Sequence, residues 1–381
     1  MRNLDNKGFE ITPQRIKIFS LTLFLVAILD TGGYIKYLFF ALFIFIFWAA
    51  NNDFILNGVE AKIIIPSVVY VVIGLFWYMI NGFYGAYAIK DIFFFIIPSL
   101  GAFILFKSFT RKDVEDFIFC FLFSSTILQL ISIIRYHNII YEDGRAFTFG
   151  IISLYYFHKN KITLAIISVL GLISANKRIA MLAFIVASVL IIISSIKNKN
   201  KVLETSKAKL LIFLVSIITL ILSLVWIYSC KSGLLQTYFQ MNKINSQGRV
   251  DMWPLFYNYF SFSVFDKGYG IGFIEYTLSN LKFKAFGNLH NDFLRSYIEL
   301  GFIGYCIYLL SYFVFPLTCV KKLNLKLGEI VSAISIIIYS FIIFLTDNVI
   351  IYIDFVFVMN FVILSVALNE ERTSKKLQVC Q

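Results

Sequence analysis

Residues 209–230 read KLLIFLVSIITLILSLVWIYSC, in which a single lysine precedes a run of uncharged and mostly apolar residues. A helix needs about 20 such residues to cross the hydrocarbon core of a bilayer. Eleven further runs bounded by charges or turn residues follow the same pattern, although the first, sixth and seventh of the twelve are short. The runs lie near residues 16–29, 34–50, 61–80, 91–107, 114–134, 147–158, 161–175, 179–196, 209–230, 293–320, 329–346 and 349–367. The sequence therefore predicts an all-α polytopic membrane protein with about twelve transmembrane helices, forming a single integral membrane domain over residues 1–381.

The first run resembles a signal peptide, because Arg15 and Lys17 precede a brief apolar core. Asp30 and Thr31, however, stand where a cleavage site would have small residues. We therefore expect this run to be an uncleaved membrane anchor.

The composition of the chain agrees with a membrane protein. Hydrophobic residues make up 59% and charged residues 15% of the 381 positions, and the mean hydropathy is +0.81. Ordinary globular domains have about 25% charged and 45–50% apolar residues. These values exclude a soluble enzyme, a disordered protein and a peripheral membrane protein. The 43 Phe and 22 Tyr residues also suit a surface that faces lipid.

The net charge of +12 reflects topology more than a ligand. Cytoplasmic loops of membrane proteins carry an excess of Lys and Arg. If the N-terminus is cytoplasmic, 21 of the 34 basic residues fall on the cytoplasmic side, six in short outer loops and seven in one long outer segment. The pattern predicts cytoplasmic N- and C-termini, and it implies no nucleic-acid partner.

A long outer loop over residues 231–292 separates spans nine and ten. Loops of this length are usually functional or disordered, and the mixed composition favours a functional loop. Within it, Trp253, Phe256, Tyr257 and Phe260 fall on one helical stripe, which predicts an amphipathic helix lying in the outer membrane interface. Either of the two residues that end the loop, Asn291 and Asp292, can cap the next span.

Two basic sites stand out at the outer face, one with two adjacent residues and one with a single arginine. Lys177 and Arg178 lie between spans seven and eight, where two adjacent cations oppose the positive-inside bias. Arg249 follows Gly248 in the long loop. Snorkelling side chains in a short turn, or a solvated loop arginine, would also explain them. An anionic partner is the functional alternative, because the planar guanidinium donates two parallel hydrogen bonds to phosphate.

A third candidate lies in residues 289–304, LHNDFLRSYIELGFIG. On a helix Asp292, Arg295 and Glu299 share one face. A purely structural ion-pair ladder explains these three about as well as catalysis does. His290 precedes the helix, where a titratable group can meet substrate and water.

Metal and disulfide chemistry are not indicated. The histidines His137, His158 and His290 are too few and too scattered for a histidine-based metal cluster. The five cysteines show no paired spacing, so no disulfide framework is implied.

The segment that closes the long loop resembles the signature of the O-antigen polymerase and ligase superfamily. The matching residues are His290-Asn291, Phe293-Leu294 and Glu299-Leu300-Gly301-Phe302-Ile303-Gly304. Further agreement comes from Arg249 and Trp253, the glycines at 268, 270 and 272, the basic turn at Arg178, and Thr346-Asp347-Asn348. The resemblance covers roughly the C-terminal 60% of the chain. This sequence has Asn-Lys-Arg where the family often has Ser-Arg, so the role expected of Arg178 could fall to Lys177.

This resemblance implies a membrane glycosyltransferase of the type-C kind that uses sugars carried on undecaprenyl diphosphate at the outer face of the cytoplasmic membrane. It implies that Arg178 and Arg249 bind the diphosphate and that His290 acts as general base or orients the acceptor. Arg145 would be a weaker anion contact. The residues expected to support the substrate site are Lys177, Asn291, Asp292, Arg295, Glu299 and Asp347. No cofactor or metal is implied, and a chain-length regulator protein is a conceivable partner.

Three activities remain open at this point. A repeat-unit polymerase would transfer the growing glycan onto another lipid-linked repeat unit, whereas a ligase would transfer it to the lipid A core. The resemblance favours the polymerase. A flippase for the same lipid would also have about twelve spans, but it should carry charges in both halves. The first five predicted spans are almost free of interior charge, which favours a one-sided enzyme. The glycan could be O-antigen, capsule or another polymer.

Overall fold

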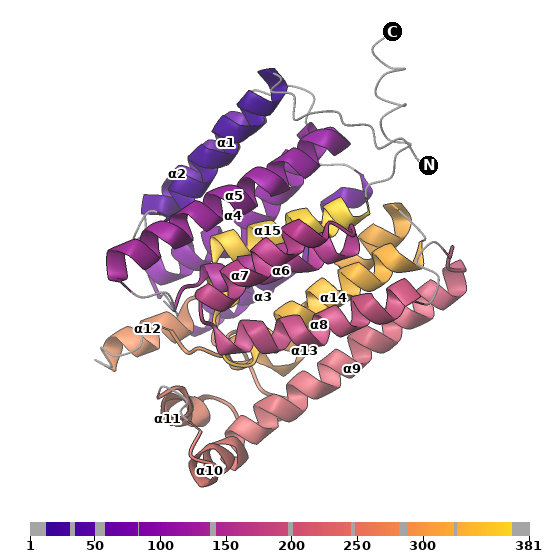
Figure 1. Cartoon of the computed structure of the whole chain (residues 1–381). Helices are drawn as coiled ribbons and strands as arrows, with labels where there is room; N and C mark the ends of the chain where they lie inside the picture. Colours follow the sequence, from indigo (N-terminus) through magenta and orange to yellow (C-terminus); the bar gives the residue numbers. More distant parts are fainter. Residues whose placement is uncertain are drawn as a thin grey trace.

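The computed structural model describes residues 13–30, 35–49, 58–82, 84–137, 142–196, 201–244, 248–281, 288–323 and 326–367. These residues form α-helices and short 3₁₀ helices with two isolated β-bridges and no strand. Both chain ends lie outside the described residues, with the basic residues Arg2, Lys7, Arg372, Lys375 and Lys376 that entered the topology prediction. The long helices lie alongside one another in one bundle (Figure 1).

Twelve helices of the described chain coincide with the twelve predicted apolar runs. They are α1 (Pro13–Asp30), α2 (Ile35–Ala49), α3 (Ile65–Asn81, preceded by the 3₁₀ helix η1, Val59–Ile64), α4 (Ala86–Ser108), α5 (Arg111–Tyr136), α6 (Arg145–His158), α7 (Ile162–Ser174), α8 (Arg178–Ile196), α9 (Thr205–Lys231), α13 (Asp292–Leu323), α14 (Leu327–Phe344) and α15 (Ile353–Val366). Six helical segments in the described ranges, among them Thr205–Lys231, are long and apolar enough to cross a membrane, and four more apolar helices are shorter. The predicted all-α polytopic membrane protein is confirmed, while the exact number of spans stays a prediction.

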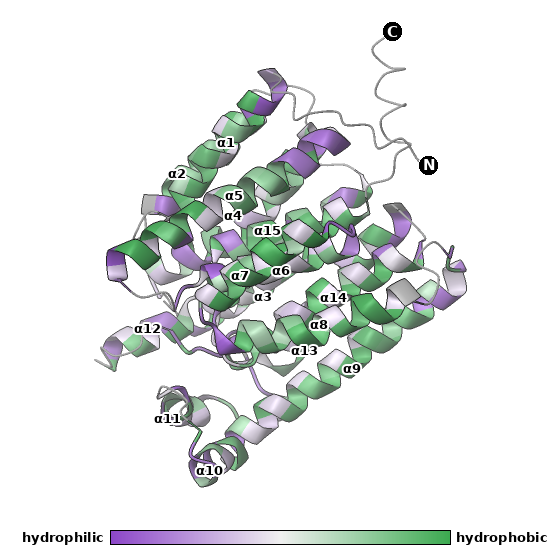
Figure 2. Cartoon of the chain, viewed as in Figure 1, coloured by the Kyte–Doolittle hydropathy of each residue, from purple (hydrophilic) through white to green (hydrophobic). Residues whose placement is uncertain are grey.

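The bundle has a buried centre and an apolar periphery. α15 is buried almost throughout, and α13 packs against α3, α9, α14 and α15. At the periphery, α9 exposes Phe213, Ile221 and Val225 by more than half of their surface. Hydrophobic residues run along the long helices and hydrophilic ones gather near the helix ends (Figure 2). This is the distribution expected when the outer surface faces hydrocarbon instead of water.

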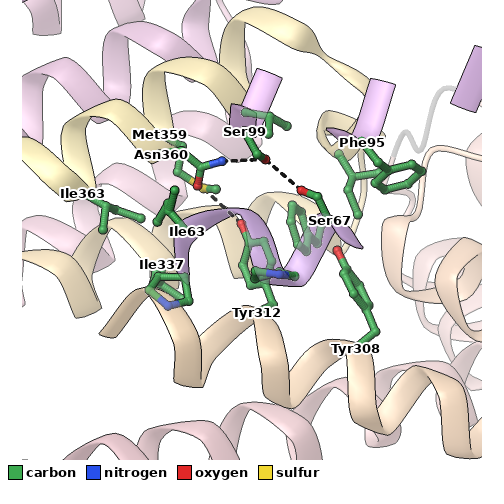
Figure 3. A pocket seen from close by; sticks show the side chains of 15 residues that line it. Ile63, Ser67, Phe95, Ser99, Tyr308, Tyr312, Ile337, Met359, Asn360 and Ile363 are labelled. Atoms are coloured by element: carbon green, nitrogen blue, oxygen red, sulfur yellow. Dashed lines mark hydrogen bonds between the residues drawn. The ribbon is translucent and has the colours of Figure 1, made fainter. Parts of the chain in front are cut away.

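Several polar side chains inside the bundle pair with one another. Beside a cavity of about 30 Å³, Ser67 of α3 and Ser99 of α4 share a hydrogen bond of 2.8 Å, and Asn360 of α15 donates to Ser99 Oγ at 2.9 Å (Figure 3). Tyr312 of α13 donates to Ser340 Oγ at 3.0 Å. Polar groups inside a membrane bundle associate helices because lipid offers them no partner. We assign this small cavity a structural role.

The long loop folds into short helices at one end of the bundle, which we call the loop end. These are α10 (Leu234–Met241), α11 (Arg249–Met252), the 3₁₀ helix η2 (Trp253–Tyr259) and α12 (Phe273–Asn280). The predicted interfacial helix over 249–260 is therefore wrong in form and in orientation. Proline has no N–H to continue an α-helix, and Pro254 stands where α11 gives way to η2. Trp253 and Phe256 are buried in the protein, and Trp253 packs edge-on against Trp226 of α9.

Residues 266–272 of the loop, which we call the strap, dock into a break in α13. The break is at Gly301, where φ is 70° and ψ is 173°. The strap N–H groups of Tyr269 and Gly270 donate to the carbonyls of Ile298 and Glu299 at 3.0 and 2.9 Å. The interruption of α13 thus provides acceptors for the strap, which explains the first glycine of the Gly-Phe-Ile-Gly motif.

The other side of the strap contacts α3 and the segment that follows it. Three hydrogen bonds join them: Ile271 N to Gly74 O at 3.1 Å, Asn81 Nδ2 to Gly268 O at 2.7 Å, and Tyr84 Oη to Tyr269 O at 2.7 Å. A Cβ atom on Gly270 would lie 2.4 Å from Tyr78 N, and one on Gly272 would lie 2.6 Å from Ala88 N. The alternating glycines are needed because the strap lies directly on helix backbone.

Replacing Gly301 with alanine should detach the strap. Its φ and ψ belong to a region essentially restricted to glycine, where another residue costs about 1–3 kcal/mol. The new Cβ would also lie 2.6 Å from Asp266 O and Gly268 N. We expect Gly301→Ala to lower the thermal unfolding temperature in nanodiscs and to expose the strap to protease.

Gly233→Ala is the matched control. Gly233 has a φ of 74°, but no atom of the described chain lies within 4 Å of the place that an alanine Cβ would occupy there. Equal changes in unfolding temperature for the two variants would contradict the role given to the break in α13.

Candidate functional site

A cavity of about 430 Å³, which we call the loop-end pocket, brings together residues that are far apart in the sequence. Its walls come from the turn between α7 and α8, the start of α8, α10 and the residues after it, α11, and the connection between α14 and α15. The lining residues are Glu142, Asn176, Lys177, Arg178, Ile179, Leu182, Phe239, Ile244, Arg249, Val250, Trp253, Thr346 and Asp347. Four residues predicted from the sequence therefore share one pocket: Lys177, Arg178, Arg249 and Asp347.

Lys177 and Arg178 reach the pocket because α7 ends in a tight turn. Asn176 adopts a left-handed conformation, with φ of 48°, and Arg178 begins α8. Lys177 Nζ lies 2.6 Å from Glu142 Oε1, whereas Arg178 makes no hydrogen bond or ion pair with the residues that the structure describes. The exposed N–H groups at a helix N-terminus also attract anions. Both cations are thus placed to contact a negatively charged ligand.

Arg249 approaches from the opposite wall, on the short helix α11. Its Nη1 donates to Thr346 O at 2.7 Å, and its Nη2 lies 3.8 Å from Asp347 Oδ2. Trp253, four residues later, donates from Nε1 to Leu289 O at 3.1 Å. A spacing of four places both side chains on one helical face. Arg249 and Trp253 together join the loop to the α14–α15 connection and to the residue before His290.

His290 joins the pocket through Asp347. Its Nδ1 lies 3.4 Å from Asp347 Oδ1, and about a quarter of the imidazole is exposed while Asp347 is buried. Oδ1 of Asp347 also accepts from Asn348 N at 2.9 Å and from Tyr352 Oη at 3.3 Å. The aspartate therefore has several donors that orient it toward the imidazole.

The electrostatics of Asp347 decide which nitrogen of His290 carries a proton. Burial alone would raise the pKa of Asp347, but the hydrogen bond from His290 and the charges of Lys177 and Arg249 outweigh burial and lower it. An ionised carboxylate only accepts hydrogen bonds. Nδ1 of His290 must then be the donor, so in the neutral imidazole the lone pair resides on Nε2. That is the arrangement of an oriented general base.

Backbone geometry at His290 is unusual. Its φ of 52° lies in the left-handed region, which non-glycine residues seldom adopt. Such conformations persist when surrounding contacts determine them, and they cluster at functional sites. Here Leu289 O is held by Trp253, and the side chain of Asn291 caps the following helix.

The first residues of α13 connect elements and do not line the pocket. Asn291 Oδ1 accepts from Leu294 N at 3.0 Å, which confirms the predicted cap. Asp292 is fully buried, and its Oδ2 accepts from Ile350 N at 3.0 Å. Both residues fix the start of α13, and Asp292 ties it to the α14–α15 connection.

Arg295 and Glu299 belong to a separate group that we call the buried ion cluster: Lys90, Asp91, Glu275, Arg295 and Glu299. Arg295 Nη2 lies 2.5 Å from Asp91 Oδ2, and its Nε lies 3.6 Å from Glu299 Oε2. Lys90 pairs with Glu275 of α12. The cluster thereby links α4, α12 and α13 beside the strap, and its geometry supports the structural ion-pair alternative.

Three of the five cluster residues, Lys90, Asp91 and Glu275, were not predicted from the sequence. The expectation that the first five spans carry almost no interior charge is wrong at α4, where Asp91 is fully buried. Asp91 begins the apolar run predicted over residues 91–107, but α4 starts earlier, at Ala86, so Asp91 lies inside the bundle. The adjacent Lys90-Asp91 pair was the available signal, since paired charges beside an apolar run can enter the protein together.

Arg145 lies away from the loop-end pocket. It lines a smaller cavity of about 40 Å³ between α1, α5, α6 and α15. Its Nη2 lies 2.5 Å from Asp143 Oδ2 and 2.7 Å from Ser132 Oγ. These contacts give Arg145 a local structural role, so the geometry does not join it to Arg178 and Arg249.

Glu142 lines the loop-end pocket but was not predicted from the sequence, because a single acidic residue in a loop has no pattern.

Within the described ranges, no group of three or more His, Cys, Asp or Glu side chains is arranged to hold a metal ion. The charged groups that face the pocket are instead three cations, Lys177, Arg178 and Arg249, and two carboxylates, Glu142 and Asp347. The cations outnumber the carboxylates by one, so this set suits an anionic ligand.

Comparison with known families matches a part of the chain that contains most of the pocket residues, but not Glu142, Thr346 or Asp347. Residues 163–309 match the model of the O-antigen ligase family. Searches of curated proteins and of solved structures gave no match. The matched range contains Lys177, Arg178, Arg249 and His290 and extends past the break in α13. This match over residues 163–309 is consistent with the O-antigen polymerase and ligase superfamily, which the sequence resembles.

Proposed function

We propose that this protein is a polysaccharide repeat-unit polymerase. It transfers a growing glycan from undecaprenyl diphosphate onto the non-reducing-end sugar of another lipid-linked repeat unit. One observation carries the proposal: Lys177, Arg178 and Arg249 surround a single pocket that adjoins the His290–Asp347 pair. The family match supports a membrane enzyme of the glycosyltransferase and ligase type.

In this proposal the loop-end pocket holds the diphosphate of the donor lipid. The leaving group is already activated, so no nucleotide is needed, and the negative charge that develops on it is held by the three cations. Prearranged charges that face the developing charge often make the largest contribution to catalysis. A guanidinium from each side, Arg178 and Arg249, can donate paired hydrogen bonds to separate phosphate oxygens. No metal ion takes part.

The acceptor sugar approaches His290. As the acceptor oxygen attacks the anomeric carbon of the donor, Nε2 of His290 takes the hydroxyl proton, and the bond between the anomeric carbon and the diphosphate oxygen breaks. The products are one longer lipid-linked glycan and free undecaprenyl diphosphate. Ionised Asp347 stabilises the imidazolium that forms and keeps the ring oriented.

The membrane orientation follows from the same assignment. Lipid-linked repeat units are presented at the outer face of the cytoplasmic membrane, so the loop end faces outward and both termini are cytoplasmic. The basic residues at the other ends of the helices support this orientation. The all-helical bundle with one large outer loop is of the type-C glycosyltransferase kind, and a chain-length regulator protein would be its partner in the membrane.

A ligase is the second candidate, because the matching family model is that of O-antigen ligases. A ligase would use the same donor pocket and the same histidine but accept a lipid A core sugar. A flippase has less support. The charges that α4 contributes near the loop end, Lys90 and Asp91, pair with Glu275 and Arg295 beside the strap.

We predict that His290→Ala lowers the rate of glycan transfer by about 10²–10⁴-fold, the contribution usual for a general base. Asp347→Asn should cost about tenfold, since a charge-assisted hydrogen bond exceeds a neutral one by about 1.4 kcal/mol. The measurement is single-turnover transfer with purified enzyme and a lipid-linked repeat unit.

The double variant separates catalysis from folding. If Asp347 acts through His290, Asp347→Asn should have no further effect on the rate once His290 is alanine. Additive losses in the double variant, or a wild-type rate for His290→Ala, would contradict the assigned roles.

We further predict that Arg178→Ala and Arg249→Ala each reduce transfer by about 10²–10³-fold, as loss of a charge-stabilising donor does. Lysine at either position should restore only part of the rate, because it lacks the planar fork. The readout is the length distribution of surface glycan together with the transfer rate.

Arg135→Ala provides the control, since Arg135 is an exposed arginine at the same end of the bundle but outside the pocket. Long glycan in both pocket variants, with protein amounts in the membrane equal to wild type, would overturn the proposed diphosphate site.

Deletion of the gene distinguishes the three activities. Without a polymerase the cell should display a single repeat unit on its surface lipid. Without a ligase it should display none and should accumulate lipid-linked polymer. Repeat units trapped on the cytoplasmic side would indicate a flippase. We predict the first outcome, measured by gel separation of surface and lipid-linked glycans, and either other outcome would contradict the polymerase assignment.

A further inference from the structure

The apolar face of α9 continues beyond the end of that helix. α9 exposes a series of large apolar side chains along its length, and its last described ones are Ile221, Leu222, Val225 and Tyr228. The chain then turns at Ser232 and Gly233, where Gly233 has a left-handed φ of 74°, and enters α10 at once. α9 ends at Lys231 and α10 begins at Leu234, so the two helices adjoin at the loop end (Figure 1).

α10 is amphipathic in an orientation that leaves its apolar side uncovered. Leu234, Tyr238 and Met241 are spaced by four and three residues, so they share one face. They are 59%, 56% and 78% exposed. On the other side Leu235 packs against the core, and Phe239 packs there and also lines the loop-end pocket.

We propose that α10 lies in the membrane interface of the outer leaflet, with phospholipid as the partner of its exposed face. Continuity with the lipid-facing surface of α9 carries this assignment. An interfacial helix buries its apolar side at the boundary between headgroups and acyl chains. Lys231, the last residue of α9, lies at the depth that we assign to the lipid headgroups. Its ammonium donates hydrogen bonds to Phe260 O at 2.7 Å and to Tyr257 O.

This position gives the loop-end pocket a wall at the membrane surface. Phe239 of α10 and Ile244 just beyond it line the pocket, and so does Leu182 of α8. Ile244 and Leu182 are 42% and 53% exposed, so this rim of the pocket is apolar and continuous with lipid-facing surface. Lys177, Arg178 and Arg249 line the same pocket. Resting on the proposed function, this arrangement admits the lipid diphosphate from within the leaflet, with its headgroup at the depth of α10.

Photolabelling tests the membrane contact independently of activity. The native protein is reconstituted in vesicles that contain a phospholipid with a diazirine near its glycerol, irradiated, and mapped by mass spectrometry. We expect labels on Leu234, Tyr238 and Met241. Labelling of these residues by a water-soluble diazirine instead, or cross-links between the α10 helices of two copies, would overturn the proposal.

A kinetic comparison tests the consequence for the pocket. Met241→Glu places a charge on the face assigned to lipid, and Gln240→Glu places the same charge on the adjacent residue as a control. We expect Met241→Glu to raise the KM for a full-length lipid donor about fivefold, equivalent to about 1 kcal/mol, with kcat unchanged and with no change for a short water-soluble donor. Equal effects of the two variants, or an equal effect on both donors, would refute leaflet-level entry. If the wild-type protein showed no glycan transfer, the proposed function would be contradicted, but the photolabelling result would still stand.

Discussion

A bilayer requires every backbone N–H and C=O inside it to find a partner within the protein, and the break in α13 depends on this constraint. At Gly301 the helix is interrupted, and the carbonyls before the break accept hydrogen bonds from the strap and from Trp77 Nε1, which bonds Leu300 O at 2.9 Å. The long loop is therefore attached to the bundle by helix backbone. This attachment keeps the loop residues Arg249 and His290 near Arg178, which begins α8, and Asp347, which lies in the α14–α15 connection.

The charges at the loop end serve two different purposes, and their partners separate them. In the buried ion cluster Asp91, Glu275, Arg295 and Glu299 are at most 5% exposed, and the ion pairs join members of the cluster to one another, as charges inside a membrane protein require. It holds α12 and α13 against α4. The cations of the loop-end pocket are partly exposed and outnumber the pocket's carboxylates. Only the second group is available to a ligand, although Arg295 and Arg249 look equally promising in the sequence.

Helix positions could be predicted because an apolar run of about 20 residues has few alternatives to spanning a bilayer. The pocket could be predicted only in part. Arg178, Arg249 and His290 stood out from the sequence, but nothing in the chain shows that α7–α8, α11 and α14–α15 converge. The stripe containing Trp253 was assigned to lipid, and it faces α9, because periodicity reveals that one face is apolar and not what covers it. Asp91 was missed for the same reason, since its partner Arg295 is 204 positions away.

The most direct test of the central claim is a cryo-electron microscopy structure of the wild-type protein in nanodiscs containing undecaprenyl diphosphate. The claim is that one pocket holds the diphosphate between arginines from different elements, beside the histidine. It predicts diphosphate density in the loop-end pocket, in contact with both Arg178 and Arg249 and on the side of His290. Density for the diphosphate at the buried ion cluster, beside Arg145, or at the opposite end of the bundle would contradict it.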